Sequence, residues 1–178
     1  MKINLKKEFI PIGISIATVS DTRTKKTDKS GVILEKKILE GGHNLIDKKI
    51  ITDEKKDIKN YFEACLDNKK VDVVITTGGS GLTDRDSTPD VLDEILEKEI
   101  PGFGEIFRML SFKKINTSTI QSRAKAGISK GKFFFCLPGS PSACVDAWEH
   151  ILRYQLDARH EPCNLIELMP RISRNDKK

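Results

Sequence analysis

The sequence predicts an α/β fold in which a mostly parallel sheet is covered by helices on both faces. Segments 10–19, 71–77 and 132–137 are short and apolar, as expected of strands that are buried on both sides. Amphipathic segments lie between them, so strands and helices alternate along the chain. This alternation implies right-handed crossovers and places ligand-binding loops beyond the carboxyl ends of the strands.

Local signals predict each element in turn. Ser30 is expected to cap a first helix that Gly41-Gly42 ends, and a strand follows over 43–52. A second helix begins near Asp53, where Ile58, Phe62 and Cys65 share one face. Further helices are expected from Thr88-Pro89, over 103–112, and from Ser140-Pro141, where a capping residue again precedes proline.

The length and composition fit one globular domain. A chain of 178 residues suits a single core, so we expect one domain over 1–178, with residues 1–8 and 165–178 as loosely ordered ends. The sequence contains no apolar run of about 18 residues and no signal-peptide pattern. We therefore expect a soluble, cytoplasmic protein without a membrane partner.

Charge, cysteines and histidines exclude several kinds of site. The lysines behind the net charge of +5 are scattered among acids, and no base-reading motif is present, so no nucleic-acid partner is expected. An anionic small molecule fits the same charge. The four cysteines form no CxxC pair, which favours reduced thiols. His43, His150 and His160 lack metal-ligand spacing, and Trp148 and Phe133-Phe134-Phe135 are interpreted as core or subunit contacts.

The strongest chemical signal is a glycine-rich loop directly after the strand over 71–77. Thr77-Gly78-Gly79-Ser80-Gly81 can expose backbone amides to a phosphate, and Asp84 and Asp86 follow at once. Asp53 ends another strand at the same predicted edge. Because carboxylates beside phosphates repel unless a divalent cation intervenes, Asp53 and Asp86 predict a Mg²⁺ site. A purely structural turn and, for Asp53, a helix N-cap are the competing interpretations.

Two further turns between a strand and a helix are candidate anion sites. Pro138-Gly139-Ser140-Pro141 leads into a helix N-terminus, where free amides favour an anion. Ser20-Asp21 and Ser30-Gly31 flank the loop after the first strand. Ser140 is alternatively only a cap, but three such turns on one edge favour a ligand site.

Taken together, these motifs resemble those of the MoaB/MogA family, to which the gephyrin G domain is related. The segments 101–112, 117–124 and 155–159 resemble the MoaB branch, and the similarity spans roughly 9–164. The resemblance implies a three-layer, Rossmann-like α/β/α sandwich that binds molybdopterin and assembles into trimers or hexamers, with the hexamer favoured. Ser80 stands where the family usually has threonine, which retains the hydroxyl.

The resemblance also implies a function, molybdopterin adenylyltransferase activity in molybdenum cofactor biosynthesis. A phosphate oxygen of molybdopterin attacks the α-phosphorus of the co-substrate ATP, with Mg²⁺ as cofactor and pyrophosphate as leaving group. The family's two aspartates correspond to Asp53 and Asp86. The alternative is a noncatalytic molybdopterin-binding scaffold or carrier in the same pathway. The expected macromolecular partner for handover is a MoeA-type molybdenum insertase. The implied binding residues are Ser20, Asp21, Ser30, Gly31, Thr77, Gly78, Gly79, Ser80, Gly81, Pro138, Gly139, Ser140 and Pro141.

Overall fold

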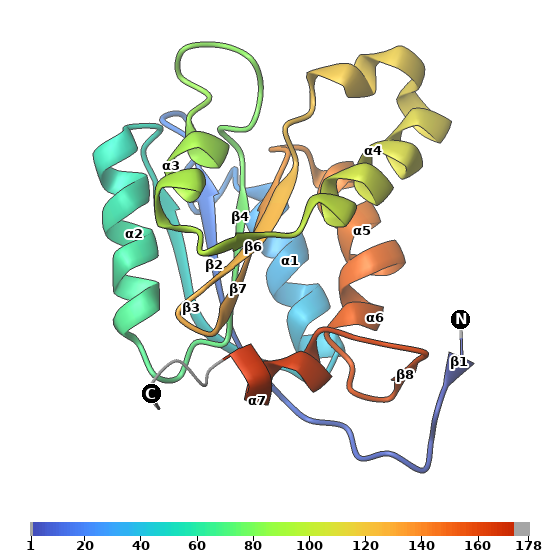
Figure 1. The fold of residues 1–178 in the computed structure, drawn as a ribbon. Helices are drawn as coiled ribbons and strands as arrows, with labels where there is room; N and C mark the ends of the chain where they lie inside the picture. The colour runs from blue at the N-terminus through green and yellow to red at the C-terminus, as the bar shows by residue number, and fades with distance from the viewer. Residues whose placement is uncertain (1, 173–178) are drawn as a thin grey trace.

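The computed structural model describes residues 2–172 and contains a central six-stranded sheet in the order β3-β2-β4-β7-β6-β5 (Figure 1). Four strands are mutually parallel, and β6 and β5 extend the sheet in antiparallel pairing beside β7. The strands are β2 (Gly13–Val19), β3 (Asn44–Ile51), β4 (Val73–Thr77), β5 (Lys98–Glu99), β6 (Lys125–Ser129) and β7 (Lys132–Leu137). The expected mostly parallel sheet is confirmed.

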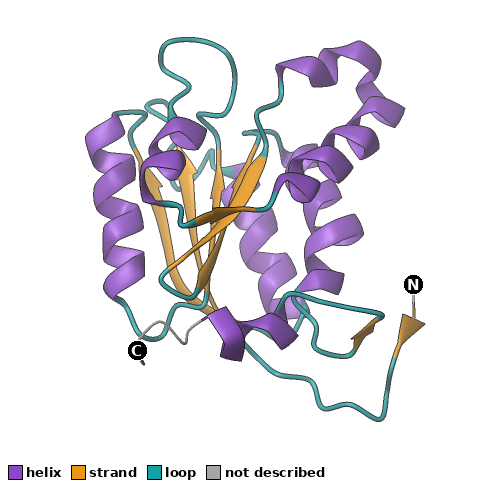
Figure 2. Cartoon of the chain, viewed as in Figure 1, coloured by secondary structure: helices purple, strands orange, loops and turns teal. Residues whose placement is uncertain are grey.

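Helices cover both faces of this sheet and form a three-layer sandwich (Figure 2). One face packs against α1 (Lys29–Glu40), α4 (Pro101–Ile115) and α5 (Pro141–Ala147), and the other against α2 (Lys55–Asp67) and α3 (Thr88–Ile95). In β7, Phe133 and Phe135 point to the first face and Phe134 to the second, and all are buried. This alternation explains why the strand is apolar throughout.

Shorter elements complete the chain. α5 continues into η2 (Trp148–Leu152) and α6 (Arg153–Gln155), and α4 continues into η1 (Asn116–Gln121). Trp148 is buried, so its interpretation as a core residue is confirmed. At the ends of the described chain lie β1 (Lys2–Ile3), β8 (His160–Glu161), η3 (Ile166–Leu168) and α7 (Met169–Ile172).

The segments predicted to be loosely ordered ends, 1–8 and 165–178, make contacts where the structure describes them. β1 pairs with β8, and Lys7 Nζ lies 2.7 Å from Glu167 Oε1, which joins the two end segments. Ile166 is buried against the core. Residues 1 and 173–178 lie outside the described residues.

Two local predictions were wrong, and one strand was missed. Asp28, and not Ser30, caps α1, because Asp28 Oδ1 accepts a hydrogen bond from the Gly31 amide at 2.8 Å. Ser87 precedes α3, and the Thr88 hydroxyl bonds instead to Gly78 O. The strand β6 was not expected, since its sequence is short, polar at both ends and interrupted by Gly127. Ser140 is confirmed as the cap of α5, with its Oγ accepting from the Ala143 amide at 3.2 Å.

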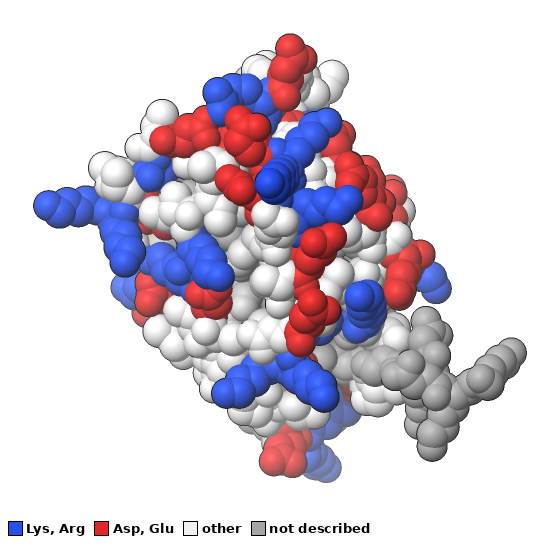
Figure 3. Space-filling view, turned by 90° about the vertical axis from the view of Figure 1, so that its left-hand side faces the viewer, with Lys and Arg blue, Asp and Glu red and all other residues white. Residues whose placement is uncertain are grey.

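The structure also describes the cysteines, the surface charges and the apolar character of the helices. Cys65, Cys136, Cys144 and Cys163 are free thiols, and the first three are buried. Acidic and basic side chains are interspersed on the face that Figure 3 shows. Within residues 2–172, no helix has both the length and the apolar character to cross a bilayer.

Candidate active site

The loops after β2, β3, β4 and β7 meet at one edge of the sheet because these strands are parallel and adjacent. Near the carboxyl ends, Thr18 is paired with Thr77, and Thr77 with Leu137. The Ser20-Asp21 loop, Asp53, the glycine-rich loop (78–81) and the Pro138-Gly139 turn therefore start from neighbouring positions. The predicted common edge is confirmed.

The glycine-rich loop has a backbone that only glycine fits at its first two positions. Gly78 and Gly79 have φ values of 104° and 60°. A Cβ on Gly78 would lie 2.2 Å from Val19 O, and one on Gly79 would lie 2.4 Å from Thr88 Oγ1. Positive φ and missing space together require glycine and leave the loop's backbone uncovered by side chains at these positions.

Buried hydroxyl groups hold the loops against one another. Thr77 Oγ1 donates to Pro138 O at 2.9 Å, Ser30 Oγ to Gly139 O at 3.2 Å, and Thr88 Oγ1 to Gly78 O at 3.0 Å. Thr77, Ser30 and Thr88 are all buried. Thr77 and Ser30 therefore position the loops in this structure, and the Gly31 amide is already bonded to the cap residue Asp28.

Asp53 lies on one flank of the glycine-rich loop. A Cβ built on Gly79 would lie 3.6 Å from Asp53 Oδ1. Asp53 and Asp21 exchange hydrogen bonds, since the Asp53 amide donates to Asp21 Oδ1 at 3.0 Å and the Asp21 amide to Asp53 Oδ2 at 3.3 Å. Arg85 pairs with Asp21, which ties the Ser20-Asp21 loop to the segment after the glycines. Burial, then repulsion from Asp86 and Glu54, raises the pKa of Asp53.

Asp86 lies on the other flank and folds back onto the loop. Its Oδ2 accepts from the Thr83 amide at 3.0 Å and from Thr83 Oγ1 at 2.6 Å. Burial acts to raise its pKa, but the Thr83 hydroxyl, the Gly81 and Thr83 amides and the charge of Arg123 hold the pKa below its usual value. Asp86 is therefore an ionised carboxylate at neutral pH, and it repels Asp53 across the loop.

Arg123, which lies just before β6, holds this loop through several hydrogen bonds. Its Nε donates to Gly81 O at 2.7 Å, its Nη2 donates to Asp86 O, and its Nη1 lies 2.7 Å from Asp90 Oδ1. The Arg123 amide also donates to Ser80 O at 3.2 Å. One guanidinium thus fixes the backbone on both sides of Asp86's turn, a role that the sequence analysis did not assign to it.

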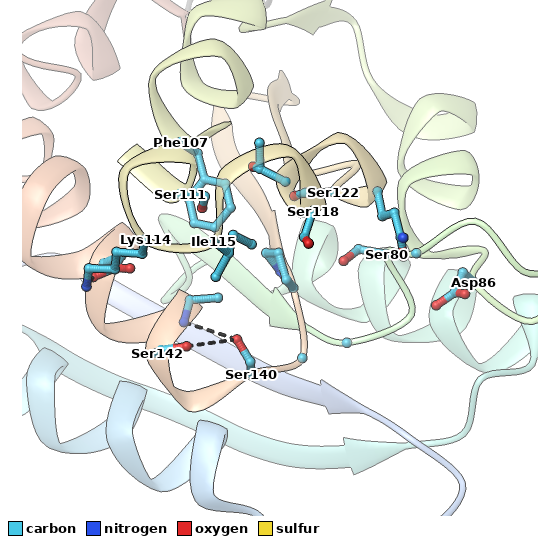
Figure 4. Close-up of a pocket in the computed structure, with 18 of the residues that line it drawn as sticks. Ser80, Asp86, Phe107, Ser111, Lys114, Ile115, Ser118, Ser122, Ser140 and Ser142 are labelled. Atoms are coloured by element: carbon cyan, nitrogen blue, oxygen red, sulfur yellow. Dashed lines mark hydrogen bonds and ion pairs between the residues drawn. The ribbon is translucent and has the colours of Figure 1, made fainter. Parts of the chain in front are cut away.

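A cleft of about 430 Å³ opens beside the glycine-rich loop, between α4–η1 and the start of α5 (Figure 4). In Figure 4, Ser80 and Asp86 lie at one side, Lys114 at the other, and Ser140 and Ser142 below. Of the predicted residues, the cleft is lined by Gly78, Gly79, Ser80, Gly81, Asp86, Pro138, Gly139 and Ser140. The other predicted residues, Ser20, Asp21, Ser30, Gly31, Asp53, Thr77 and Pro141, do not line it.

Much of the cleft wall was missed by the sequence analysis. It consists of residues from α4, from η1 and the residue after it, and three from α5, namely Phe107, Ser111, Lys114, Ile115, Ser118, Thr119, Gln121, Ser122, Ser142, Ala143 and Asp146. The available signal was the run of serine and threonine around Thr117-Ser118-Thr119, but a local run does not indicate which loop it faces.

Two carboxylates near the glycine-rich loop, Asp53 and Asp86, are the candidate donors for a metal ion. No group of three or more His, Cys, Asp or Glu side chains within residues 2–172 is arranged to hold a metal ion. Mg²⁺ commonly binds one or two carboxylates together with substrate phosphates and water. The donor set therefore fits a magnesium ion whose coordination is completed by a phosphorylated ligand.

The sheet, the glycine-rich loop and the cleft define a three-layer α/β protein with a ligand cleft at the carboxyl edge of its parallel strands. Comparisons identify the family. Residues 15–158 match the model of a probable molybdopterin binding domain. The chain is 46% identical over 157 residues to Molybdenum cofactor biosynthesis protein B of Escherichia coli (strain K12), covering 88% of this chain and 92% of that protein. The chain belongs to the MoaB/MogA family.

Two further relatives agree. The Probable molybdopterin adenylyltransferase of Methanocaldococcus jannaschii is 40% identical over 150 residues, which cover 80% of this chain and 89% of that protein. A crystal structure of Molybdenum cofactor biosynthesis protein B superposes with a TM-score of 0.85 at 35% identity, covering 95% of this chain and all of that one. The family and the fold inferred from the sequence are thereby confirmed.

Proposed function

We propose that this protein is a molybdopterin adenylyltransferase, which uses ATP and Mg²⁺ to adenylylate the phosphate of molybdopterin and releases pyrophosphate. The carrying observation is that Asp53 and Asp86 flank one glycine-rich loop at the end of a cleft. The relative from Methanocaldococcus jannaschii bears the name of this activity.

In the proposed reaction, an oxygen of the pterin phosphate attacks the α-phosphorus of ATP. A new P–O–P bond forms, the bond between the α- and β-phosphates breaks, and pyrophosphate takes the electron pair. The amides of 78–81 and the polar groups of Ser80 and Ser140 bind and orient phosphate oxygens. No covalent enzyme intermediate is needed, because positioning and charge stabilisation supply the rate.

Asp53 and Asp86 would hold the magnesium ion, and Arg123 keeps Asp86's turn in place for it. When bound, Mg²⁺ neutralises charge that develops on the phosphate oxygens. The Ser20-Asp21 loop lies outside the cleft but is bonded to Asp53. This supports a nucleotide position over that loop. The predicted residues that do not line the cleft would then contribute to the nucleotide site or support it, namely Ser20, Asp21, Ser30, Gly31, Thr77 and Pro141.

The wider setting is also a proposal. We place the reaction in the cytoplasm and expect a homo-oligomer, a hexamer before a trimer, which hands adenylylated molybdopterin to a MoeA-type insertase. Exposed apolar side chains on α4 and η1, among them Met109, Phe112 and Ile120, support subunit contacts. Light scattering on the purified protein distinguishes trimer from hexamer.

The test is to incubate the purified protein with molybdopterin, ATP and Mg²⁺ and to measure pyrophosphate and adenylylated pterin. Asp86→Asn should lower turnover at least about 100-fold while pterin binding persists, because removing a charge-stabilising group typically costs this much. Asp84→Asn, at an exposed neighbour that does not line the cleft, is the matched control. Pterin binding without turnover in the wild type would instead establish the noncatalytic carrier.

A further inference from the structure

The cleft has two chemically different ends. The glycine-rich loop and Asp86 form one end, where the proposed reaction places the phosphate oxygens. Figure 4 shows Lys114 at the opposite end, with Phe107 and Ile115 between the two ends. A ligand that carries a phosphate on one side and a flat ring on the other would match this division.

Lys114 and Asp146 form an ion pair in the wall at this far end. Lys114 Nζ, from α4, lies 2.5 Å from Asp146 Oδ1, from α5. Asp146 is only 5% exposed, whereas the Lys114 side chain is 56% exposed. Among the described residues that line the cleft, Lys114 is the only cationic one. An ion pair with one exposed partner adds little to stability, so stability alone does not explain a charged pair in a cleft wall.

The pair presents a donor next to two acceptors. The ammonium group of Lys114 donates, and the two carboxylate oxygens of Asp146 accept. The pyrimidine edge of a pterin carries the complementary order, with its 4-oxo group as acceptor and N3–H and the 2-amino group as donors. An oxygen of Asp146 that accepts from Lys114 has a second lone pair, so the pair need not break to bind this edge.

Apolar groups beside the pair suit the ring itself. Phe107 and Ile115 from α4 and Ala143 from α5 line the cleft together with Lys114 and Asp146. Apolar walls with a few placed polar groups are the usual composition of a site for a flat heterocycle. We propose that Lys114 and Asp146 recognise the 2-amino-4-oxopyrimidine edge of the substrate, which rests on the proposed function and fixes the direction in which the pterin lies.

The experiment is equilibrium dialysis of the full chain, without ATP or Mg²⁺, against 6-hydroxymethylpterin and its 2-oxo counterpart, 6-hydroxymethyllumazine. The wild type should prefer the pterin by about 10-fold or more, because the lumazine leaves an acceptor facing an acceptor. Asp146→Asn offers a donor at that position, so this variant should reverse the preference. Loss of folding cannot produce tighter lumazine binding.

Further variants and a second ligand complete the test. Lys114→Met should weaken both ligands, while Lys113→Ala, at an exposed neighbour outside the cleft, should change neither. Guanine shares the recognised edge, so GMP is included, and tighter Asp146-dependent binding of GMP than of pterin would overturn the assignment. Unchanged pterin preference in Asp146→Asn, or no pterin binding by the wild type, would also overturn it.

This outcome is separable from the outcome for the proposed function. A wild type that selects pterin through Asp146 but forms no pyrophosphate contradicts the adenylyltransferase and leaves the recognition intact. If the wild type forms pyrophosphate but the Asp146→Asn variant still prefers the pterin, the recognition is contradicted and the adenylyltransferase stands.

Discussion

Replacing Arg123 by alanine should slow adenylyl transfer by about 30-fold, because this side chain holds the turn that carries Asp86. Arg123 lies outside the set of cleft-lining residues, so its effect is exerted through the loop. Its guanidinium bonds to the carbonyl oxygens of Gly81 and Asp86, on both sides of the turn. Without it, both carbonyls turn to water and the loop samples other conformations.

The magnitude follows from these contacts. A hydrogen bond to a charged group contributes about 1.5–3 kcal/mol when buried, and part-exposed bonds contribute less, so about 1 kcal/mol for each carbonyl is a reasonable value. The ion pair with Asp90 adds little, since the Asp90 side chain is 51% exposed. The sum of about 2 kcal/mol corresponds to a factor of about 30 in rate.

The assay is pyrophosphate release at saturating molybdopterin and ATP, with thermal unfolding as the measure of folding. Asp90→Ala is the matched control, since it removes only the exposed partner of the same guanidinium and should leave the rate within about 3-fold of the wild type. Arg123→Lys keeps the charge but cannot bond both carbonyls at once, so its rate should be intermediate. Full activity in Arg123→Ala, or an equal loss in Asp90→Ala, would refute the positioning role.

Two further predictions concern stability. Gly78→Ala should lower the free energy of unfolding by about 2–4 kcal/mol, because its Cβ would meet Val19 O at 2.2 Å with φ at 104°. Gly102→Ala is the matched control, because Gly102 lies in helix α4 and a Cβ there would meet nothing within 4 Å. This change should raise the free energy of unfolding by up to about 1 kcal/mol. Similar urea midpoints for the two variants would contradict this reasoning. Burial lowers the pKa of His43 from 6.5 to about 4, against the opposing attraction of Asp157, so the unfolded chain takes up the proton first as the pH falls. Stability should therefore decrease as the pH falls from 6.5 to 4, and this decrease should be about 3 kcal/mol smaller in His43→Gln. Parallel pH profiles of unfolding for the two proteins would exclude His43 as the cause.

The sequence predicted the parts of the fold that depend on local pattern. Buried parallel strands must be apolar on both faces, so Val73–Thr77 and the aromatic run in β7 were recognisable. Loops that follow parallel strands meet at one edge, so the shared location of the glycine-rich loop and Asp53 followed from topology alone. Gly78 could also be found from local pattern, because adjacent glycines directly after a strand indicate a turn with positive φ.

The missed features depend on contacts between distant segments. Arg123 and Gly81 are separated by 42 positions, and no local pattern indicates that they bond. The strand β6 is defined by its pairing with β7, since its own sequence includes a glycine and few apolar residues. Asp28 and Ser30 both suit a helix cap, and only the position of the first helical turn decides between them.

The charges around the glycine-rich loop account for the proposed need for a divalent cation. Arg85 is paired with Asp21, and Arg123 is bonded to two carbonyls and Asp90, so both arginines near the loop are engaged. Lys114, the one cation among the described residues of the cleft wall, is paired with Asp146 at the far end. Polyphosphate that enters beside Asp53 and Asp86 therefore meets backbone amides and two acids. Because carboxylates and phosphates repel one another, the proposed ATP site depends on a cation from solution, and magnesium removal should weaken ATP binding far more than binding of a pterin without phosphate.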